Sequence, residues 1–329
     1  MRRGTIGWLL RGLAVIAVTA IIALWVLVHP LHEPSHPAFT PTGTATATVA
    51  PTVRPTQTPP PPTLTPPASP IEEHPAATIT STASVELVGR VEEQVYFSLT
   101  TGAEEPYRIY LPPGYDEATR RYPVLYLLHG WPYEAAHWGA LGVEETVNAG
   151  IQSGALPLCI IVQPQGSERM YVNTSGGDQS FEGQIINDLI PHVDATYRTW
   201  AEREGRAIGG ISRGGVWSLE IGFSHPDVFA AVGAHSPALS VNMAPPAHDP
   251  FYLLEEPEVA ALRIYLDAGD ADWSREYTQK LHEALAAHNV ASEFVVHPGG
   301  HATGLWSANV NEYLDFYTAG WHQSPQTEN

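Results

Sequence analysis

The ten residues Arg206–Gly215, RAIGGISRGG, decide the fold class of this 329-residue chain. Within them, Gly210–Gly214 fits Gly-x-Ser-x-Gly, the pattern of a strand that turns sharply into a helix with a serine at the turn. Side chains two residues before and after Ser212 would clash in such a turn, so glycine is expected at both positions. An ordinary glycine-rich turn is the alternative, but a strand over Arg206–Ile211 and an amphipathic helix over Arg213–Phe223 favour a strained, exposed Ser212 nucleophile.

Around this turn, the sequence alternates between strands and helices. Tyr122–Leu128 and Leu156–Gln163 are continuous apolar runs, which are typical of buried strands in a parallel sheet. Further strands are expected over 85–99, 107–111, 229–233, 262–266 and 292–296, and helices over 143–152, 181–197, 273–288 and 305–317. This alternation predicts a three-layer α/β architecture with a mostly parallel central sheet.

His129-Gly130-Trp131 follows the first of these buried strands. A glycine there lets the backbone turn and present an N–H toward Ser212. We expect the N–H of Trp131 and that of Arg213 to form an oxyanion hole, although an ordinary strand-to-helix turn is the alternative for the first. His129 itself is expected to brace the loop and not to act as an acid or base.

An acidic loop follows the strand over 262–266, and it offers three carboxylates: Asp267, Asp270 and Asp272. A catalytic histidine needs one acid to hold its tautomer and stabilise its charged form. Asp272 is best placed, because it lies farthest into the loop beyond the strand end. Asp270 and Asp267 remain as alternatives, with solvated loop or helix N-cap roles for those not used.

The base is expected in His297-Pro298-Gly299-Gly300-His301, after the last strand. His301 lies beyond the glycine pair and is the better candidate, whereas His297 is expected to end the strand. The resulting order Ser…Asp…His matches that of α/β-hydrolases.

At this point the domain resembles the esterase D family of α/β-hydrolases. That group includes feruloyl, acetylxylan and enterochelin-type esterases, S-formylglutathione hydrolases and mycolyltransferases. The resemblance rests on YLPPGY (110–115), YPVLYLLHGW (122–131), DLIPHVDATYRT (188–199), AIGGISRGG (207–215), HPDVF (225–229) and GGH (299–301) with Trp306.

The resemblance implies an α/β-hydrolase fold and a serine carboxylic-ester hydrolase that works through an acyl-enzyme. It implies Ser212 as nucleophile, His301 as base, Asp272 as acid, and the N–H groups of Trp131 and Arg213 as the oxyanion hole. No cofactor or metal is implied. Relatives often have an apolar residue where this chain has Arg213, which puts a cation next to the nucleophile.

Two other enzyme activities would use the same triad, and a third alternative lies outside enzymes. An acyltransferase of the mycolyltransferase type would pass the acyl group to an alcohol, and a serine peptidase would use the same triad. A non-catalytic binding module on a stalk is the alternative outside enzymes. The expected substrate is a small-molecule or carbohydrate-linked ester.

A membrane anchor is expected over residues 1–28. Arg2 and Arg3 precede Gly12–Val28, a run of apolar and small residues without charge. This length and the positive flank predict a transmembrane signal anchor with the rest of the chain extracytoplasmic. A cleaved signal peptide, which would give a secreted protein, is the alternative.

Residues 29–84 are expected to be a disordered linker before the esterase domain at 85–329. The linker holds 14 of the 30 prolines and has few large apolar residues, so it cannot bury a core. His29, His32 and His36 are a poor candidate for a metal site in such a tract.

Charge and cysteine content exclude several function classes. The net charge of −19 disfavours nucleic acid and anionic lipid headgroups as partners. The single cysteine, Cys159, excludes an intrachain disulfide framework and a multi-cysteine zinc site. A weaker signal is a glycosylation sequon at Asn173. Four aromatic residues could form a rim around the site, although core packing explains them equally well: Trp131, Tyr133, Trp138 and Tyr171.

Overall fold

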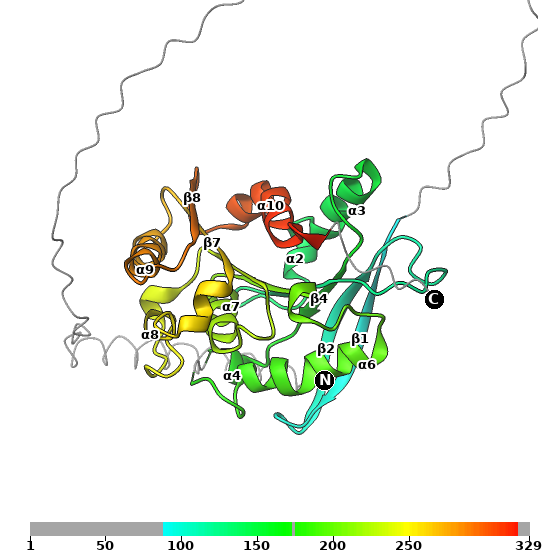
Figure 1. The fold of residues 1–329 in the computed structure, drawn as a ribbon, viewed down its shortest axis with the longest axis horizontal. Coiled ribbons are helices and arrows are strands. Elements are labelled where there is room, and N and C mark those ends of the chain that lie inside the picture. The colour runs from blue at the N-terminus through cyan, green and yellow to red at the C-terminus, as the bar shows by residue number, and fades with distance from the viewer. Residues whose placement is uncertain (1–87, 173–174, 322–329) are drawn as a thin grey trace, which may run out of the picture. The chain divides into compact units, whose positions relative to one another are not determined.

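A computed structural model describes residues 88–172 and 175–321 (Figure 1). The expected anchor at 1–28, the expected linker at 29–84 and the sequon at Asn173 lie outside these residues. Within the described ranges, no helix has both the length and the apolar character needed to cross a membrane.

The described residues form an eight-stranded sheet in the order β1-β2-β4-β3-β5-β6-β7-β8. Strands β3 to β8 run parallel to one another, whereas β1 pairs antiparallel with β2, and β2 antiparallel with β4. The strands are β1 (Arg90–Ser98), β2 (Ala103–Leu111), β3 (Val124–Leu128), β4 (Ile160–Pro164), β5 (Arg206–Ile211), β6 (Ala231–His235), β7 (Arg263–Gly269) and β8 (Glu293–His297). The expected mostly parallel sheet is confirmed.

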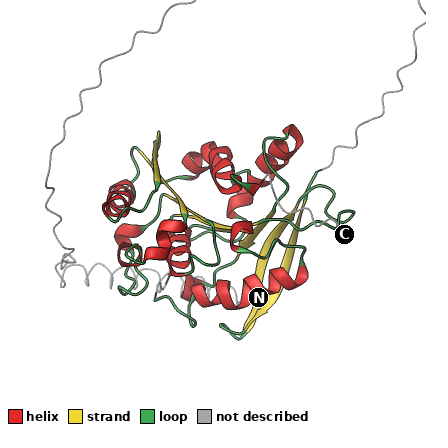
Figure 2. Cartoon of the chain, in the orientation of Figure 1, coloured by secondary structure: helices red, strands yellow, loops and turns green. Residues whose placement is uncertain are grey.

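Helices cover both faces of this sheet, which gives three layers (Figures 1 and 2). One face packs against α2 (His137–Ala140), α3 (Val143–Ser153) and α10 (Thr303–Thr318), and the other against α6 (Ile190–Thr196), α7 (Arg213–Ser224) and α9 (Arg275–Ala287). The shorter helical segments are α4 (Glu168–Val172), α5 (Phe181–Gly183), a π-helical stretch (Gln184–Leu189), α8 (Pro250–Leu253) and 3₁₀ turns at Arg203–Gly205, Leu239–Val241 and Pro257–Ala261.

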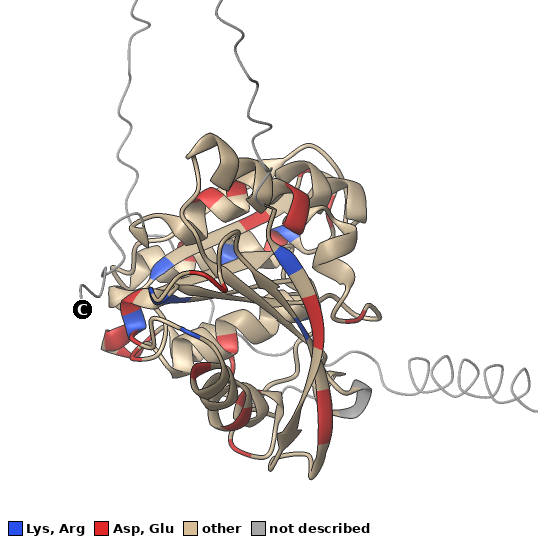
Figure 3. Cartoon of the chain, turned by 90° about the vertical axis from the view of Figure 1, so that its right-hand side faces the viewer, with Lys and Arg blue, Asp and Glu red and all other residues tan. Residues whose placement is uncertain are grey.

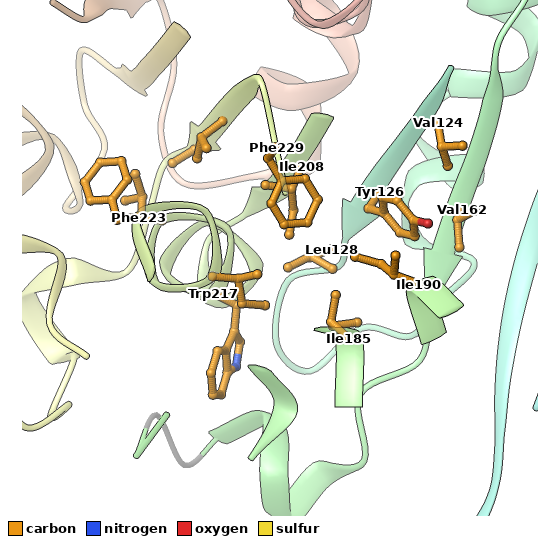
Figure 4. Close-up of a cluster of buried hydrophobic side chains, with 14 of the residues drawn as sticks. Val124, Tyr126, Leu128, Val162, Ile185, Ile190, Ile208, Trp217, Phe223 and Phe229 are labelled. Atoms are coloured by element: carbon orange, nitrogen blue, oxygen red, sulfur yellow. The ribbon is translucent and has the colours of Figure 1, made fainter. Parts of the chain in front are cut away.

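Two buried hydrophobic clusters, one on each side of the sheet, hold these layers together. Figure 4 shows part of one of them, which includes Leu128 of β3, Ile208 of β5, Trp217 of α7 and Ile185. The other cluster contains Trp138 and the C-terminal helix α10. Every residue of β3 to β6 is buried, which explains why apolar and small residues predominate in these strands.

Strand register brings the loops of the site to one edge. Leu128 pairs with Gly210, Ile211 with His235, and His235 with Asp267. The carboxyl ends of β3, β5, β6 and β7 therefore lie next to one another. Open α/β sheets bind their ligands at this edge.

Candidate active site

Ser212 lies in the turn between β5 and α7, and its backbone has a positive φ of 55°. Few non-glycine residues adopt such a φ. Its N–H donates to the carbonyl of His235 at 2.8 Å, and its own carbonyl accepts the N–H of Ala238 at 3.1 Å. The expected strained turn is present, and β6 and the segment after it hold it in place.

The two glycines of the turn are sterically required. A Cβ on Gly210 would lie 2.1 Å from the carbonyl oxygen of Gly214. A Cβ on Gly214 would lie 2.5 Å from the carbonyl oxygens of Leu128 and His129. The first clash is within the turn, as predicted from the sequence, and the second is with the end of β3.

The structure brings Ser212, His301 and Asp272 together. His301 Nε2 lies 2.9 Å from Ser212 Oγ, and its Nδ1 lies 3.0 and 3.2 Å from the two carboxylate oxygens of Asp272. With the proton on Nδ1, His301 donates to Asp272 and accepts from the Ser212 hydroxyl. This is the tautomer that a general base next to a serine requires.

Asp272 is almost fully buried, and its carboxylate accepts hydrogen bonds from His301 and from the N–H of Ser274. Burial by itself would raise the pKa of Asp272. The hydrogen bonds from His301, from the N–H of Ser274 at 2.8 Å and from the hydroxyl of Ser236 outweigh burial and lower this pKa below its ordinary value. Asp272 is therefore ionised beside the imidazole.

The two other candidate acids have different partners. Asp270 accepts the N–H of Gly299 at 2.9 Å, which ties its loop to the one that carries His301. Asp267 is fully buried and contacts His235 Nδ1 at 2.9 Å, while the hydroxyl of Tyr313 donates to it at 2.8 Å. Of the three aspartates, only Asp272 has a hydrogen bond to His301 among the described residues.

The loop after β3 lies against the nucleophile. A Cβ on Gly130 would be only 3.6 Å from Ser212 Cβ. The N–H of Gly130 donates to His137 Nδ1 at 3.2 Å, and burial lowers the pKa of His137 to about 4, so it stays neutral and able to accept. Trp131 follows on this loop. Arg213 is the first residue of α7, so its N–H has no acceptor within the helix.

His129 braces this loop as expected. Its Nδ1 donates to the carbonyl of Gly130 at 2.9 Å, and its Nε2 accepts the N–H of Gly166 at 3.2 Å. Burial lowers the pKa of His129 to about 4. His129 is thus a neutral structural link between the loops after β3 and β4. His297 is the last residue of β8, also as expected.

The four aromatic residues divide between the two alternatives, an exposed rim and core packing. Trp131 and Tyr133 are 44% and 43% exposed, but Trp138 and Tyr171 are buried and donate to the carbonyls of Leu128 and His129. These two side chains belong to the core because their polar ends satisfy backbone carbonyls at the end of β3.

Sequence analysis missed four groups at the site: Ser236, the N–H of Ser274, His137 and Trp273. Trp273 is half exposed, and its ring centroid lies 4.4 Å from that of His301. Ser236 and His137 reach the site only through tertiary packing, whereas Trp273 and Ser274 lie one and two residues after Asp272. The tryptophan next to an expected catalytic aspartate was the one signal that could have been used.

The Arg213 side chain is held against backbone carbonyls. Its guanidinium donates to the carbonyls of Tyr171 and Val172, at the end of α4. The arginine next to the nucleophile therefore ties α7 to α4.

Within 88–172 and 175–321, no group of three or more His, Cys, Asp or Glu residues is arranged to hold a metal ion. His29, His32 and His36 lie outside those ranges. Cys159 is buried, and burial raises the pKa of its thiol to about 12.

Solved structures share this fold. A ferulic acid esterase superposes with a TM-score of 0.64 at 24% identity, over 70% of this chain and 99% of that one. An S-formylglutathione hydrolase from Staphylococcus aureus superposes with a TM-score of 0.60 at 19% identity, over 70% and 99% of the two chains. Both have the α/β-hydrolase arrangement of sheet and helices found here.

Sequence comparison gives the family. An endo-1,4-beta-xylanase/feruloyl esterase of Xylanibacter ruminicola is 29% identical over 64% of this chain, and an esterase of Mycobacterium tuberculosis is 32% identical over 41% of it. Each match spans 29% of the relative's own length. The esterase family described as "Putative esterase" matches residues 98–317, which is more than half of the chain. The chain belongs to this esterase family of the α/β-hydrolase fold.

Proposed function

We propose that the chain is a serine carboxylic-ester hydrolase with Ser212 as nucleophile, His301 as general base and Asp272 as the acid. The observation that carries this proposal is the continuous set of hydrogen bonds from Ser212 Oγ through both nitrogens of His301 to the Asp272 carboxylate. Membership in the esterase family supports it.

In the proposed reaction, His301 Nε2 takes the Ser212 proton while Oγ attacks the ester carbonyl carbon. The carbonyl oxygen becomes an oxyanion, to which the N–H groups of Trp131 and Arg213 donate. The tetrahedral intermediate then expels the alkoxide, which takes the proton from His301. Water, deprotonated by the same nitrogen, hydrolyses the acyl-serine and regenerates the hydroxyl.

The substrate class we propose is an ester with an aromatic acyl group. The names of the relatives include feruloyl esterases, and one related structure, from Anaeromyces mucronatus, is a complex with ferulic acid. In this chain the exposed rings of Trp131, Tyr133 and Trp273 lie on loops at the carboxyl edge of the sheet and offer a surface for a planar group.

We also propose that residues 1–28 anchor the enzyme in a membrane and that 29–84 hold its domain outside. The apolar run after Arg2 and Arg3 and the proline-rich tract support this arrangement. Protease accessibility of the domain in intact cells tests it.

The test of the activity compares the full chain with its Ser212→Ala variant on p-nitrophenyl esters from acetate to long chains and on methyl ferulate. We expect turnover by the wild type and a loss of about a thousandfold or more in the variant. A fluorophosphonate should label only the wild type. A folded wild type that neither turns over an ester nor accepts the label would contradict the proposal and favour a binding module.

A further inference from the structure

We propose that His137 is a positioning residue for the oxyanion hole. Its imidazole accepts the N–H of Gly130 and thereby aims the next backbone N–H, that of Trp131, at the oxygen of the reacting carbonyl. This inference rests on the proposed function, since it concerns the oxyanion hole of the same reaction.

The backbone of Gly130 is held on both sides by hydrogen bonds. Its N–H donates to His137 Nδ1 at 3.2 Å. Its carbonyl accepts from His129 Nδ1 at 2.9 Å and from the N–H of Tyr133 at 2.9 Å. The N–H and the carbonyl belong to the two peptide planes that meet at the Gly130 Cα, so these contacts fix the orientation of both planes.

These contacts determine where the N–H of Trp131 points. The peptide bond between Gly130 and Trp131 is trans, so this N–H points away from the carbonyl of Gly130. That carbonyl faces His129 and the N–H of Tyr133, and the Trp131 N–H therefore lies on the opposite side of the peptide. Within the described residues no group accepts it, which leaves it for an oxygen of the substrate.

His137 and the nucleophile lie next to the same glycine. A Cβ on Gly130 would be 3.5 Å from His137 Cε1 and 3.6 Å from Ser212 Cβ. The imidazole stacks on the ring of Tyr133, with 3.9 Å between centroids and an angle of 6°. It meets the ring of Trp306 edge-on at 5.9 Å and 88°. These two rings hold the imidazole in the orientation that serves Gly130.

The other nitrogen of His137 indicates that the acceptor has a function. Because Nδ1 accepts from Gly130, the proton of the neutral imidazole is on Nε2. Nε2 is buried and has no hydrogen-bond partner among the described residues. Burial of an unpaired N–H is unfavourable, and a phenylalanine could pack between Tyr133 and Trp306 without one. The acceptor that a histidine presents to Gly130 explains its presence here.

The first test compares His137→Phe with His137→Asn in the full chain. Phenylalanine keeps an aromatic ring and removes the acceptor, whereas asparagine removes the ring and offers its side-chain oxygen near the place of Nδ1. We expect His137→Phe to lower kcat on p-nitrophenyl acetate about tenfold or more with KM nearly unchanged, because one oxyanion donor is misdirected. His137→Asn should remain within about threefold of the wild-type kcat, since it restores a neutral acceptor.

This comparison separates positioning from packing. If the imidazole only filled space, His137→Phe would keep the wild-type kcat, and His137→Asn would lose activity together with thermal stability. That result would overturn the proposal. A matched control is His192→Phe on α6, because His192 also packs against two tyrosine rings and contacts the hydroxyl of Tyr107 at 3.1 Å. It lies on the other face of the sheet, so this variant should keep the wild-type kcat.

The second test measures the inhibition constant of an aryl trifluoromethyl ketone. Ser212 Oγ adds to the ketone carbon, its proton passes to His301, and the ketone oxygen becomes an oxyanion in the proposed hole. The inhibition constant should rise in His137→Phe by the same factor by which kcat/KM falls. His137→Leu, which also lacks an acceptor, should behave in the same way and replaces His137→Phe if the larger ring does not fit. A slower variant that binds the ketone as tightly as the wild type would contradict a role at the oxyanion hole.

The two proposals fail in different ways. A wild type that is inactive and takes no fluorophosphonate label contradicts the esterase activity itself. An active wild type whose His137→Phe variant is equally fast contradicts only the role of His137.

Discussion

Glycine has opposite consequences at two matched positions of this fold. Gly214 and Gly304 are each the second residue of a helix, α7 and α10 respectively. A Cβ on Gly214 would lie 2.5 Å from two backbone oxygens of β3 and its loop, whereas a Cβ on Gly304 would meet nothing within 4 Å. The same substitution is therefore tolerated at one helix start and not at the other.

We expect Gly304→Ala to stabilise the protein by up to about 1 kcal/mol, because alanine is the better helix former. Gly214→Ala should destabilise it by about 2 kcal/mol or more, since β3 must move away from α7. Denaturant midpoints of the two variants measure both changes. Equal effects of the two substitutions would show that the clash at Gly214 is relieved at little cost.

In the proposed triad and around it, some residues could be predicted from the sequence and others could not. Ser212 and its two glycines form a local motif, and His301 follows the last strand, so both were predictable. Asp272 remained one of three candidates, because the choice depends on which loop carboxylate faces His301. Ser236 was not predictable, since it follows β6 whereas Asp272 follows β7, on a separate loop.

At the scale of elements, α7 carries a buried acid that the proposed reaction does not use. Glu220 is fully buried, and among the described residues neither of its carboxyl oxygens has a hydrogen-bond partner. Burial raises its pKa well above the ordinary value, the charge of Arg213 opposes this, and Glu182 and Asp249 reinforce it. Glu220 therefore keeps its proton to a higher pH in the folded protein than an ordinary glutamate does.

Glu220→Gln should remove a pH-dependent destabilisation. The folded state keeps a proton on Glu220 that the unfolded chain releases above the ordinary glutamate pKa. Stability therefore falls as pH rises, by up to about 1.4 kcal/mol per pH unit, until the pH reaches the folded-state pKa. The glutamine variant lacks this proton release, so its advantage over the wild type should grow with pH.

Urea unfolding at about pH 6 and about pH 8.5 checks this expectation. The control is Glu283→Gln on the exposed side of α9, which should leave the slope of stability against pH unchanged. A Glu220→Gln variant with the wild-type slope would mean that Glu220 is ionised in the fold.

The elements themselves were largely predictable from hydrophobic pattern. β5 has the expected bounds, and α7 extends one residue further than predicted, because both are long buried runs next to the glycine turn. The helix expected over 181–197 is instead broken by a π-helical stretch at Gln184–Leu189. Apolar spacing does not distinguish such a stretch from regular helix, and the short α4 and α8 carry too few residues to show a period.

At the scale of the whole molecule, acidic positions outnumber basic ones across the strands and helices (Figure 3). Two of the arginines illustrate how the few basic side chains are paired. Arg206 contacts Asp194 at 2.5 Å, and Arg263 donates to the carbonyls of Phe316 and Tyr317 on α10. We expect an enzyme of this charge to discriminate against anionic esters in solution, more strongly at low salt.

The hydrophobic core places the N-terminal boundary of the folded domain at β1. The core clusters of the described residues extend from Tyr96 to Trp321. The β1 hairpin also has buried polar contacts: Gln184 Nε2 donates to the Tyr96 hydroxyl at 2.9 Å, and Ser98 Oγ donates to Asp188 at 2.7 Å. β1 therefore contributes side chains to the core in addition to its pairing with β2.

A chain that begins at Val85 should therefore fold and match the full chain in kcat, whereas one that begins at Ala103 should not. The shorter chain loses the buried Tyr96 ring and leaves Asp188 without the Ser98 hydroxyl and the Thr100 N–H. Loss of a large buried aromatic side chain lowers the free energy of unfolding by about 3–5 kcal/mol. The carboxylate of Asp188, left without these two donors, lowers it further. Thermal unfolding and ester turnover of both truncations measure the difference. If the chain from Ala103 were as stable as the chain from Val85, β1 would be an appendage to the sheet, and the domain boundary would lie after it.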